Sequence, residues 1–488
     1  MQATYRIEPR EKKLIGFLTA LFVLLNAVAF TRDVYILAVL PIAIFVGYLL
    51  FYNTKFLLLF IVFATPLSFN FEDLAAFGGI GFYFPTEPLL FALMILYIVK
   101  LLGGYREKAE FITHPLTLAI LFNLAWLGIT VFTSVDFIVS LKFLISRLWF
   151  VLVMYFMINS FFQDRELVRR FYLALILSMT VAIVYTVSAH ASFGFSEEAG
   201  HWVMFPFFKD HTSYGAIIAL IFPMVIFHLW RAKGLSLQKL LWFVITIIFS
   251  VGLVLSYTRA AWVSLVGALG IYLLIKLRID YKLVVITLLM LVGAFFAFQD
   301  DIIHQLEKNR QDSSDSFAEH VQSITNISSD ASNLERLNRW NSAWKMFLDR
   351  PFFGHGPGTY MFEYAKYQKS SDKTIISTNQ GDAGNAHSEY LGPMSESGVF
   401  GVVTMLIIVI VSIYTGVKLY YQLDHDPYIK GIVMCIVLGL TTYYLHGILN
   451  NFLDTDKASI PVWGSMSVLV AISIYHRKKS KSLEPAAE

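Results

Sequence analysis

Most side chains of this sequence that could do polar chemistry gather in one segment, residues 299–404, which stands between long apolar runs. Imidazoles exchange protons near neutral pH, guanidiniums bind phosphate through paired hydrogen bonds, and carboxylates can orient either group. The segment supplies all three kinds of group, on His355, His387, Arg336, Arg339, Glu389 and Glu396. Hydrocarbon cannot solvate such a stretch, so it must lie on one side of a membrane. We interpret it as the candidate active region.

A second set of cations lies near the ends of apolar runs. Arg259 stands in a connection so short that its two flanking runs must form a hairpin. It is either a helix-end residue that snorkels to the interface or a guanidinium held for an anionic ligand. Lys142 and Arg147 carry the same alternatives, because apolar residues recur around them at helical spacing. That pattern predicts an amphipathic helix at the membrane surface that leads into a span.

Metal sites are not expected from the sequence. Lys209, Asp210 and His211 directly precede an apolar run, but their spacing matches no zinc or calcium pattern. The chain has a single cysteine, Cys435, inside an apolar run. This excludes a disulfide framework and a cysteine-based metal site.

The composition indicates an all-α polytopic membrane protein. Of the 488 residues, 57% are hydrophobic and only 15% are charged, and the mean hydropathy is +0.62. Soluble domains carry roughly 25% charged residues, and apolar runs of this length are typical of membrane spans. We predict about 12 to 14 transmembrane helices. The net charge of +3 is too small to suggest nucleic acid as a partner.

The distribution of Lys and Arg predicts the orientation of the chain. With the N-terminus in the cytoplasm, most of the 38 Lys and Arg residues fall in cytoplasmic segments, and the long loop is external. We therefore predict a transmembrane bundle over residues 1–298 with about 11 spans. An external catalytic loop then covers 299–397, and C-terminal spans with a basic cytoplasmic tail cover 398–488.

Within the loop, residues 303–332 are rich in Ser and Asp and predict a mobile strip. Residues 333–348 predict an amphipathic helix that Pro351 ends, followed by a glycine-rich turn over 354–358. The apolar stripe of this helix, which we expect to pack onto the bundle, consists of Leu337, Trp340, Trp344 and Phe347. Arg336 and Arg339 lie beside the stripe, and Arg336 is either a ligand-binding cation or part of a solvated face.

The end of the segment carries an ordered motif: His387 and Ser388, then nine residues, then Gly398-x-x-Gly401-x-x-Thr404. Here the chain resembles the O-antigen ligase and polymerase superfamily, whose pattern of His, then Asn, Ser or Gln, nine residues and GxxGxxT is met at every position. The loop helix with its glycine turn at Gly354 and Gly356 is also similar to that family, as is the Ser-x-x-Arg element ending at Arg259. That element has Tyr and Thr before the arginine, where the family commonly has Ser. The resemblance covers about residues 137–450.

The resemblance implies a membrane-embedded glycosyltransferase of the GT-C-like type with no metal or other cofactor. It implies transfer of a glycan from undecaprenyl diphosphate to a sugar hydroxyl of a lipid-anchored or growing acceptor. The expected location is the bacterial inner membrane, with both termini cytoplasmic and the long loop periplasmic. The expected partners are the lipid-linked donor, the acceptor glycan and membrane lipids.

The chemistry of such a reaction predicts a role for each candidate residue. An imidazole can remove the acceptor proton, and guanidiniums can stabilise a departing diphosphate without a metal. We expect His387 to be the general base, unless it is a structural histidine, and Arg259 and Arg336 to clamp the diphosphate. The lesser substrate-binding candidates are Arg147, Lys142, Arg339 and Glu389, and the structural motif residues are Ser388, Gly398, Gly401, Thr404, Gly354 and Gly356. One base without an evident nucleophile favours inversion.

Other functions stay open at this point. A polymerase of the same fold would use the same residues and differ in its acceptor. A polysaccharide flippase or exporter would also be polytopic with charges facing a cavity. Such transporters are commonly built from internal repeats, and this sequence shows no convincing repeat. We therefore expect an O-antigen ligase-type enzyme of lipopolysaccharide assembly.

Overall fold

The computed structural model describes residues 9–32, 40–71, 81–234, 236–280, 331–368 and 384–476, together with residues 282, 283, 286 and 290. Nearly all of the apolar run 282–298, at the end of the predicted bundle, and of the predicted mobile strip 303–332 lies outside these residues. The chain divides into two units between residues 58 and 59. The first unit holds α1 (Pro9–Phe30) and α2 (Leu40–Tyr52), and α3 (Thr54–Ala64) continues into the second.

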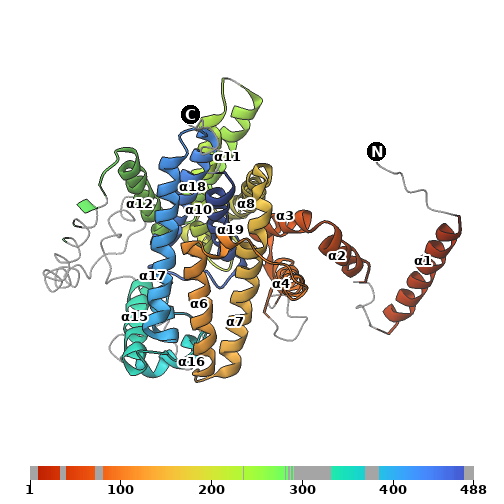
Figure 1. The fold of residues 1–488 in the computed structure, drawn as a ribbon, viewed down its shortest axis with the longest axis horizontal. Coiled ribbons are helices and arrows are strands. Elements are labelled where there is room, and N and C mark those ends of the chain that lie inside the picture. The colour runs from red at the N-terminus through yellow and green to blue at the C-terminus, as the bar shows by residue number, and fades with distance from the viewer. Residues whose placement is uncertain are drawn as a thin grey trace, which may run out of the picture. The chain divides into compact units, whose positions relative to one another are not determined.

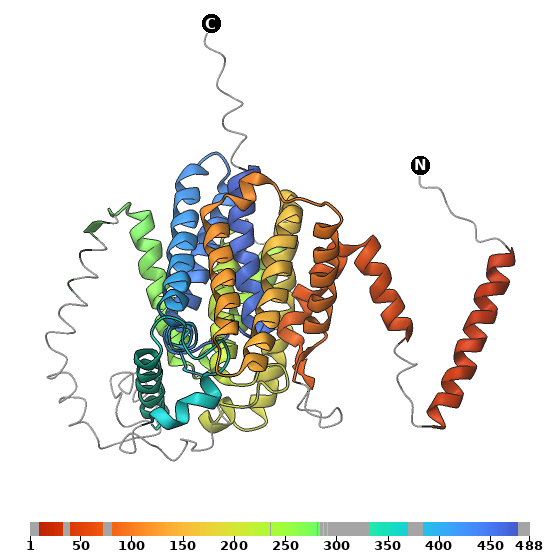
Figure 2. The same ribbon diagram turned by 60° about the horizontal axis from the view of Figure 1, so that its bottom comes forward.

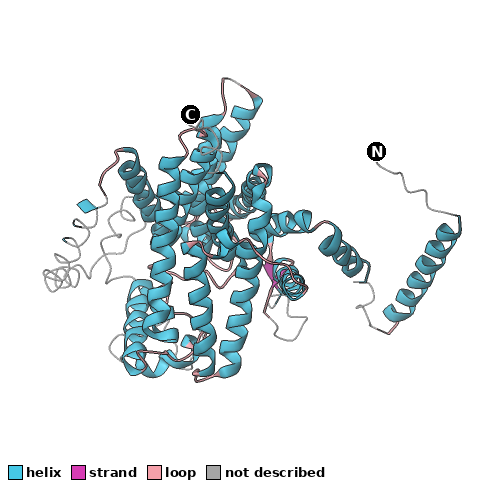
Figure 3. Ribbon diagram, viewed as in Figure 1, coloured by secondary structure: helices cyan, strands magenta, loops and turns pink. Residues whose placement is uncertain are grey.

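Helices make up almost all of the described structure (Figure 3). Nine of them are long and apolar enough to cross a membrane, or ten if residues 44–52 and 54–67 form one bent span, among the residues that the structure describes. They are α6 (Pro115–Phe132), α7 with its continuation (Phe137–Gln163), α8 (Arg165–Ala191), α10 (His211–Arg231), α11 (Leu237–Val254), α12 (Arg259–Lys276), α17 (Leu391–Gln422), α18 (Pro427–His446) and α19 with its continuation (Asp456–His476) (Figure 1). The prediction of an all-α polytopic membrane protein is confirmed.

The exact number of spans stays a prediction. The apolar part of α1 is only residues 16–30, and the run 282–298 lies mostly outside the described residues. α4 (Thr86–Leu102) is apolar and has 17 residues. Lys142 and Arg147 lie on α7, which runs continuously into a span, and the expected position of its first part at the membrane surface stays a prediction.

Short elements join the long helices. β1 (Phe69–Asn70) and β2 (Tyr83–Phe84) form an antiparallel pair in which Phe69 lies opposite Phe84. The short α-helices are α5 (Ala109–Ile112), α9 (Glu197–Gly200) and α16 (Tyr360–Glu363), and the 3₁₀ turns are η2 (Thr65–Leu67), η5 (Ser160–Gln163) and η6 (Tyr364–Tyr367). The π-helical turns η4 (Leu152–Met157) and η8 (Ile472–His476) continue α7 and α19.

Side chains fix where many of the long helices begin. An oxygen just before the helix accepts a hydrogen bond from one of the first free backbone amides, which stabilises a helix start by about 1 kcal/mol. These residues are Asp136 before α7, Asp164 before α8, Asp210 before α10, Ser236 before α11 and Asp426 before α18.

α19 is the central helix of the second unit and is buried along almost its whole length. Small residues let neighbouring helices approach it closely. A Cβ at Gly464 would lie 2.4 Å from the ring of Phe171, and Ser467 donates a hydrogen bond to Tyr155 O (2.9 Å). Around it, α10 and α12 pack on α18, and α17 packs on α6 and α18.

The first turn of α19 is held by a buried polar network. The carboxylate of Asp456 accepts hydrogen bonds from Ser68 (2.5 Å) and Thr86 (2.6 Å). The ammonium of Lys457 donates to the carbonyls of Thr65 and Ser68, both at 2.6 Å. Buried charges are tolerated when they are paired and hydrogen-bonded in this way. The network joins α19 to η2 and α4.

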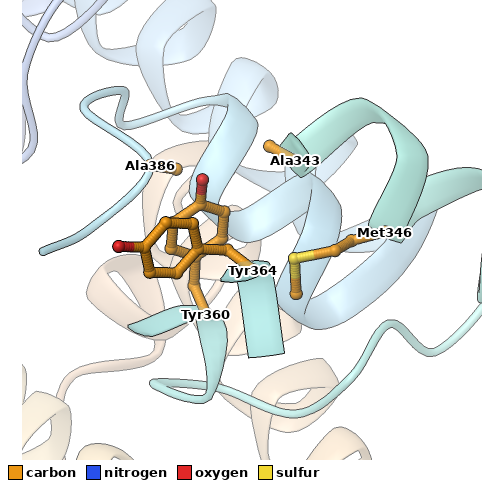
Figure 4. Close-up of a cluster of buried hydrophobic side chains, with 5 residues drawn as sticks. All are labelled: Ala343, Met346, Tyr360, Tyr364 and Ala386. Atoms are coloured by element: carbon orange, nitrogen blue, oxygen red, sulfur yellow. The ribbon is translucent and has the colours of Figure 1, made fainter. Parts of the chain in front are cut away.

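α15 (Ala331–Asp349) belongs to the long loop and packs against α17. With α16 and η6 it encloses a small core of Ala343, Met346, Tyr360, Tyr364 and Ala386 (Figure 4). Figure 2 shows α15 and α16 at one end of the helix bundle, which we call the loop end. The loop end therefore has a folded layer of its own, packed onto the ends of the spans.

Candidate functional site

The GxxGxxT motif lies where α17 is broken. Gly398 has φ 69° and ψ −161°, so the helix is interrupted there and nearby backbone groups lose their helical partners. The glycine turn that follows α15 replaces these partners, through hydrogen bonds from His355 N to Ser395 O (3.1 Å), from Gly356 N to Glu396 O (2.8 Å) and from Val399 N to Pro351 O (2.8 Å). The two motifs therefore form one structural unit, although more than 30 residues separate them.

The motif glycines are required by close contacts. A Cβ on Gly354 would lie 2.3 Å from the backbone of Glu396, and one on Gly356 would lie 1.9 Å from Ser134 Oγ. Both residues also have positive φ angles. A Cβ on Gly401 would lie 2.4 Å from Pro393 O. Each glycine therefore lets two backbone segments touch, and no room is left there for a ligand.

The two hydroxyl residues of the motif also have structural contacts. Thr404 accepts a hydrogen bond from Asn123 Nδ2 (2.8 Å) on α6. Ser388 Oγ accepts from the amides of Tyr390 and Leu391, each at 3.3 Å, where α17 begins. The sequence prediction that the motif lets helices approach closely agrees with these contacts.

We predict that Gly398→Ala destabilises the protein strongly. A Cβ there would lie 2.1 Å from Phe352 O, and the left-handed φ alone costs an L-residue about 1–3 kcal/mol. Thermal unfolding in detergent measures the effect. Gly270→Ala is the control, because Gly270 lies within α12 and a Cβ there would meet no described atom inside 4 Å, so stability should hold or rise. Equal unfolding temperatures for both variants would contradict the prediction.

His387 is held in an uncommon backbone conformation beside this unit. Its φ is +48°, in the left-handed region, where His is among the residues tolerated best. Its amide donates to Asn385 Oδ1 (3.0 Å), and its carbonyl accepts from Trp340 Nε1 (3.4 Å) on α15. Burial, reinforced by the positive charges of Arg339 and Arg336, lowers the pKa of His387 from 6.5 to about 4. The imidazole is therefore uncharged at neutral pH.

Side chains from α15, from the start of α10 and from the end of α18 act electrostatically on one another near His387. The guanidinium of Arg336 acts electrostatically on the imidazoles of His387, His211 and His446. His211 is the first residue of α10, and His446 is the last of α18. The carboxylate of Asp210 also acts on all three imidazoles. This group forms a polar cluster of mixed charge at the loop end, and the structure places the predicted base and Arg336 together in it.

Contacts of the residue before Arg259 place the start of α12 beside this cluster. It is the first residue of α12 and follows Thr258, whose hydroxyl donates to His211 O (2.7 Å). A Cβ on Gly215, one turn into α10, would lie 2.8 Å from Thr258. The start of α12 is thus fixed beside the start of α10, so Arg259 lies next to the cluster.

Arg339 has contacts that differ from those we predicted. Its Nε bonds Glu335 Oε1 (2.8 Å), its Nη1 donates to Asn385 O (3.2 Å), and its guanidinium lies 5.5 Å from the ring centre of Tyr364. The side chain is buried. These partners occupy much of the hydrogen-bonding capacity of the Arg339 guanidinium and connect α15 to the turn before His387. The geometry assigns Arg339 to bracing this turn.

Glu389 also differs from the prediction. One carboxylate oxygen, Oε1, accepts hydrogen bonds from Tyr443 (2.5 Å), Phe452 N (2.7 Å) and Leu453 N (2.8 Å). The amide of Glu389 donates to Gly447 O (2.8 Å). Burial raises the pKa of this carboxyl. Glu389 therefore holds the connection between α18 and α19 against the motif and does not point to the imidazole.

Arg147 lines a small cavity near the motif. The cavity is also lined by Glu389, Glu396 and Gly401. The positive charge of Arg147 stabilises the carboxylates around it, including that of Asp454, and its guanidinium lies 5.4 Å from the ring centre of Phe143. Lys142, earlier on α7, is exposed. The roles predicted for Arg147 and Lys142 in substrate binding stay predictions.

The sequence interpretation missed several members of the cluster. His446 is buried, its Nε2 lies 3.1 Å from Asn450 Nδ2, and its Nδ1 has no hydrogen-bond partner among the described residues. The rings of His201 and His211 stack with centres 4.4 Å apart. Polar residues at span ends are costly and often functional, so His446 and Asn450 at the end of α18 could have been selected on that ground.

Comparison with known proteins gives one family and one relative. Residues 244–406 match the family model described as O-antigen ligase. A Haemophilus influenzae protein described as uncharacterized is 23% identical over 267 residues, which are 51% of this chain and 61% of that protein. The match thus spans less than two thirds of that relative. The family match includes α12 with Arg259, α15 with Arg336, and the motif from His387 to Thr404. The family match agrees with the resemblance to the O-antigen ligase and polymerase superfamily that the motifs of this chain indicate.

Proposed function

We propose that this protein transfers a glycan from a lipid diphosphate carrier to a hydroxyl of an acceptor sugar, as an O-antigen ligase. The observation that carries the proposal is an uncharged, partly buried His387 within electrostatic reach of Arg336 in one polar cluster at the loop end. An uncharged imidazole can accept a proton, and a guanidinium is suited to a diphosphate. The family match supports a membrane glycosyltransferase-like role in O-antigen assembly.

The proposed reaction is a single displacement. The acceptor hydroxyl attacks the anomeric carbon, and its proton passes to the imidazole of His387. The bond between the anomeric carbon and the diphosphate oxygen breaks, and the lipid diphosphate leaves with the electron pair. Arg336 and Arg259 stabilise the charge that develops on the leaving oxygen. A single displacement inverts the configuration at the anomeric carbon.

The remaining charged candidates take supporting roles in this proposal. Arg339 fixes the turn that carries His387, because its guanidinium is occupied by Glu335 and Asn385. Arg147 balances the buried carboxylates beneath the motif. Lys142 is exposed and stays a candidate for an anionic headgroup. The loop end faces the periplasm and the termini face the cytoplasm of a bacterial inner membrane, in agreement with the Lys and Arg bias.

The pH dependence follows from the state of His387. Because its pKa is about 4, the base stays unprotonated until the medium is far more acidic than the ordinary value of 6.5. We expect kcat/KM, measured from about pH 8 to about pH 4, to fall with a midpoint near 4, since this ratio reports the free enzyme. The unfolded chain binds this proton below 6.5 and the folded chain does not, so stability also falls over that range. A midpoint near 6.5 would contradict the buried base.

A transfer assay in proteoliposomes tests the function and identifies the acceptor. The vesicles receive a lipid diphosphate-linked glycan carrying a labelled sugar, together with one of two acceptors. Label on a lipid A-core acceptor supports the ligase, and label on a second donor molecule, forming a longer glycan, identifies a polymerase of the same superfamily. Donor that crosses the bilayer with its anomeric bond intact would overturn the proposal in favour of a flippase.

A further inference from the structure

α15 buries several polar residues beside its core residues Ala343 and Met346, and it exposes large apolar ones. Its buried positions include Glu335, Asn338, Arg339 and Ser342. Its exposed positions form one stripe at helical spacing, and three of them are large apolar residues: Leu337 (45% exposed), Trp344 (50%) and Leu348 (60%). The sequence prediction that this apolar stripe packs onto the bundle is therefore wrong for Leu337 and Trp344. An amphipathic helix at a protein surface in water buries its apolar face and exposes its polar face.

The turn after α15 fixes the depth of its C-terminal end. The ring of Phe353 stacks on Trp126 with centres 5.6 Å apart, and Trp126 contacts Phe400 of α17 at 4.8 Å. Trp126 lies six residues before the end of α6, which is about 9 Å along the helix axis. Both α6 and α17 are membrane-spanning helices. The turn therefore reaches below the end of a span.

Exposed large apolar side chains lie on α15, on the turn that follows it and on these spans. Phe352, next to the stacked ring, is 65% exposed. Other exposed large apolar side chains lie on α6 above and below Trp126 and beside Phe400 on α17: Phe122, Ile129, Phe132, Val403 and Leu406. The side chains on α6 and α17 face lipid in any membrane protein that uses these helices as spans. The stripe of α15 has the same apolar character.

We propose that the stripe formed by Leu337, Trp344 and Leu348, with Phe352, lies in the hydrocarbon boundary of the leaflet at the loop end. Its occupant is the acyl chains of bilayer phospholipids. α15 is thus an interfacial helix whose outward face is lipid-bound and whose inward face holds the polar site. The Ser- and Asp-rich residues 303–332 are too polar in composition to suit this surface.

In this position, the lipid leaflet helps to hold the polar cluster in place through α15. α15 carries Arg336 and also Trp340, which donates to the carbonyl of His387. A helix anchored by its apolar face keeps a fixed height and rotation relative to the bilayer. The headgroup of any lipid-linked ligand lies at the same boundary. The inference depends on the membrane-spanning helices and does not depend on the proposed transfer reaction.

The experiment measures lipid contact directly. Cys435, the single cysteine, is buried in α18 and is first replaced by serine. An NBD fluorophore is then attached to Leu348→Cys or Phe352→Cys in nanodiscs whose phospholipids carry brominated acyl chains. Phe122→Cys on the lipid-facing side of α6 is the positive control, and Lys366→Cys, exposed in η6, is the aqueous control.

We expect brominated chains to quench residues 348 and 352 as strongly as residue 122, and to leave residue 366 unquenched. A water-soluble quencher should give the reverse order. Quenching of 348 and 352 by the soluble agent alone would overturn the proposal, because the stripe would face water. Protection from both agents would also overturn it, because another part of this chain or a second protein would cover the stripe. Gel filtration and thermal unfolding confirm that each labelled variant is folded.

Discussion

Replacing His387 with alanine is expected to lower the turnover of glycan transfer by about 10²–10⁴-fold, the usual contribution of a general base. The donor should still bind, because Arg336 and Arg259 remain. We also expect His387→Asn to be as inactive as the alanine variant. Asn tolerates the φ of +48° found here but cannot take up the proton. The measurement is single-turnover transfer in proteoliposomes, with donor binding recorded separately.

The control for this prediction is His425→Ala. His425 is an exposed histidine in the turn between α17 and α18, at the end of the bundle opposite the loop end. Its loss should leave transfer unchanged. If His387→Asn folds, binds donor and turns over at the normal rate, the imidazole is not the base. His446 would then be the next candidate, because its Nδ1 lacks a partner among the described residues.

The spans and the motif positions could be predicted from the sequence because each depends on local pattern. An uninterrupted apolar run of sufficient length is stable in a membrane as a helix, so apolar runs such as those of α10, α18 and α19 form long helices. The loop helix predicted over 333–348 is α15 over Ala331–Asp349 for the same reason. The prediction that His387 and Arg336 act together rests on their place in the same loop segment and stays a prediction.

The break in α17 could not be predicted from local pattern. Its cause is a set of hydrogen bonds from residues 351–356, which replace those lost at Gly398. Glycine in an apolar run is compatible with an unbroken helix, so only the tertiary contact decides the outcome. The prediction that the apolar stripe of α15 packs onto the bundle was wrong for a related reason. Periodicity shows that two faces differ, and it does not show whether protein or lipid meets the apolar one.

The hydrogen-bond and ion-pair partners of individual charged residues could not be predicted from the sequence either. Residue type predicts that a carboxylate will accept hydrogen bonds, and Glu389 does so. Its partners come from α18 and from residues 452 and 453, about 60 residues later, and nothing in the spacing selects them. Arg336 and Arg339 are three residues apart on the same helix and both act electrostatically on His387, and Arg339 is also held in a buried ion pair with Glu335.

Arg336 and Arg339 are expected to give opposite results when each is replaced by glutamine. Arg336→Gln should lower kcat/KM for the lipid diphosphate donor by about 10²–10³-fold, the usual effect of removing one group that stabilises developing charge. Its unfolding temperature should change little. Arg336→Lys keeps the charge but loses the paired donors, so it should recover only part of the activity. Transfer kinetics and thermal unfolding, measured on the same preparations, separate the two effects.

Arg339→Gln should instead act first on stability. It removes the guanidinium that pairs with the buried carboxylate of Glu335, and breaking a buried ion pair costs about 3–5 kcal/mol. Any loss of transfer should then follow the loss of folded protein and the loosening of the turn at Asn385 and His387. Arg350→Gln, at the exposed end of α15, is the matched control and should change neither quantity. If Arg336→Gln keeps normal kcat/KM while Arg339→Gln stays folded and fails to bind donor, the clamp has been assigned to the wrong arginine. In that case the contacts of Arg339 with Glu335 and Asn385 must open when the diphosphate binds.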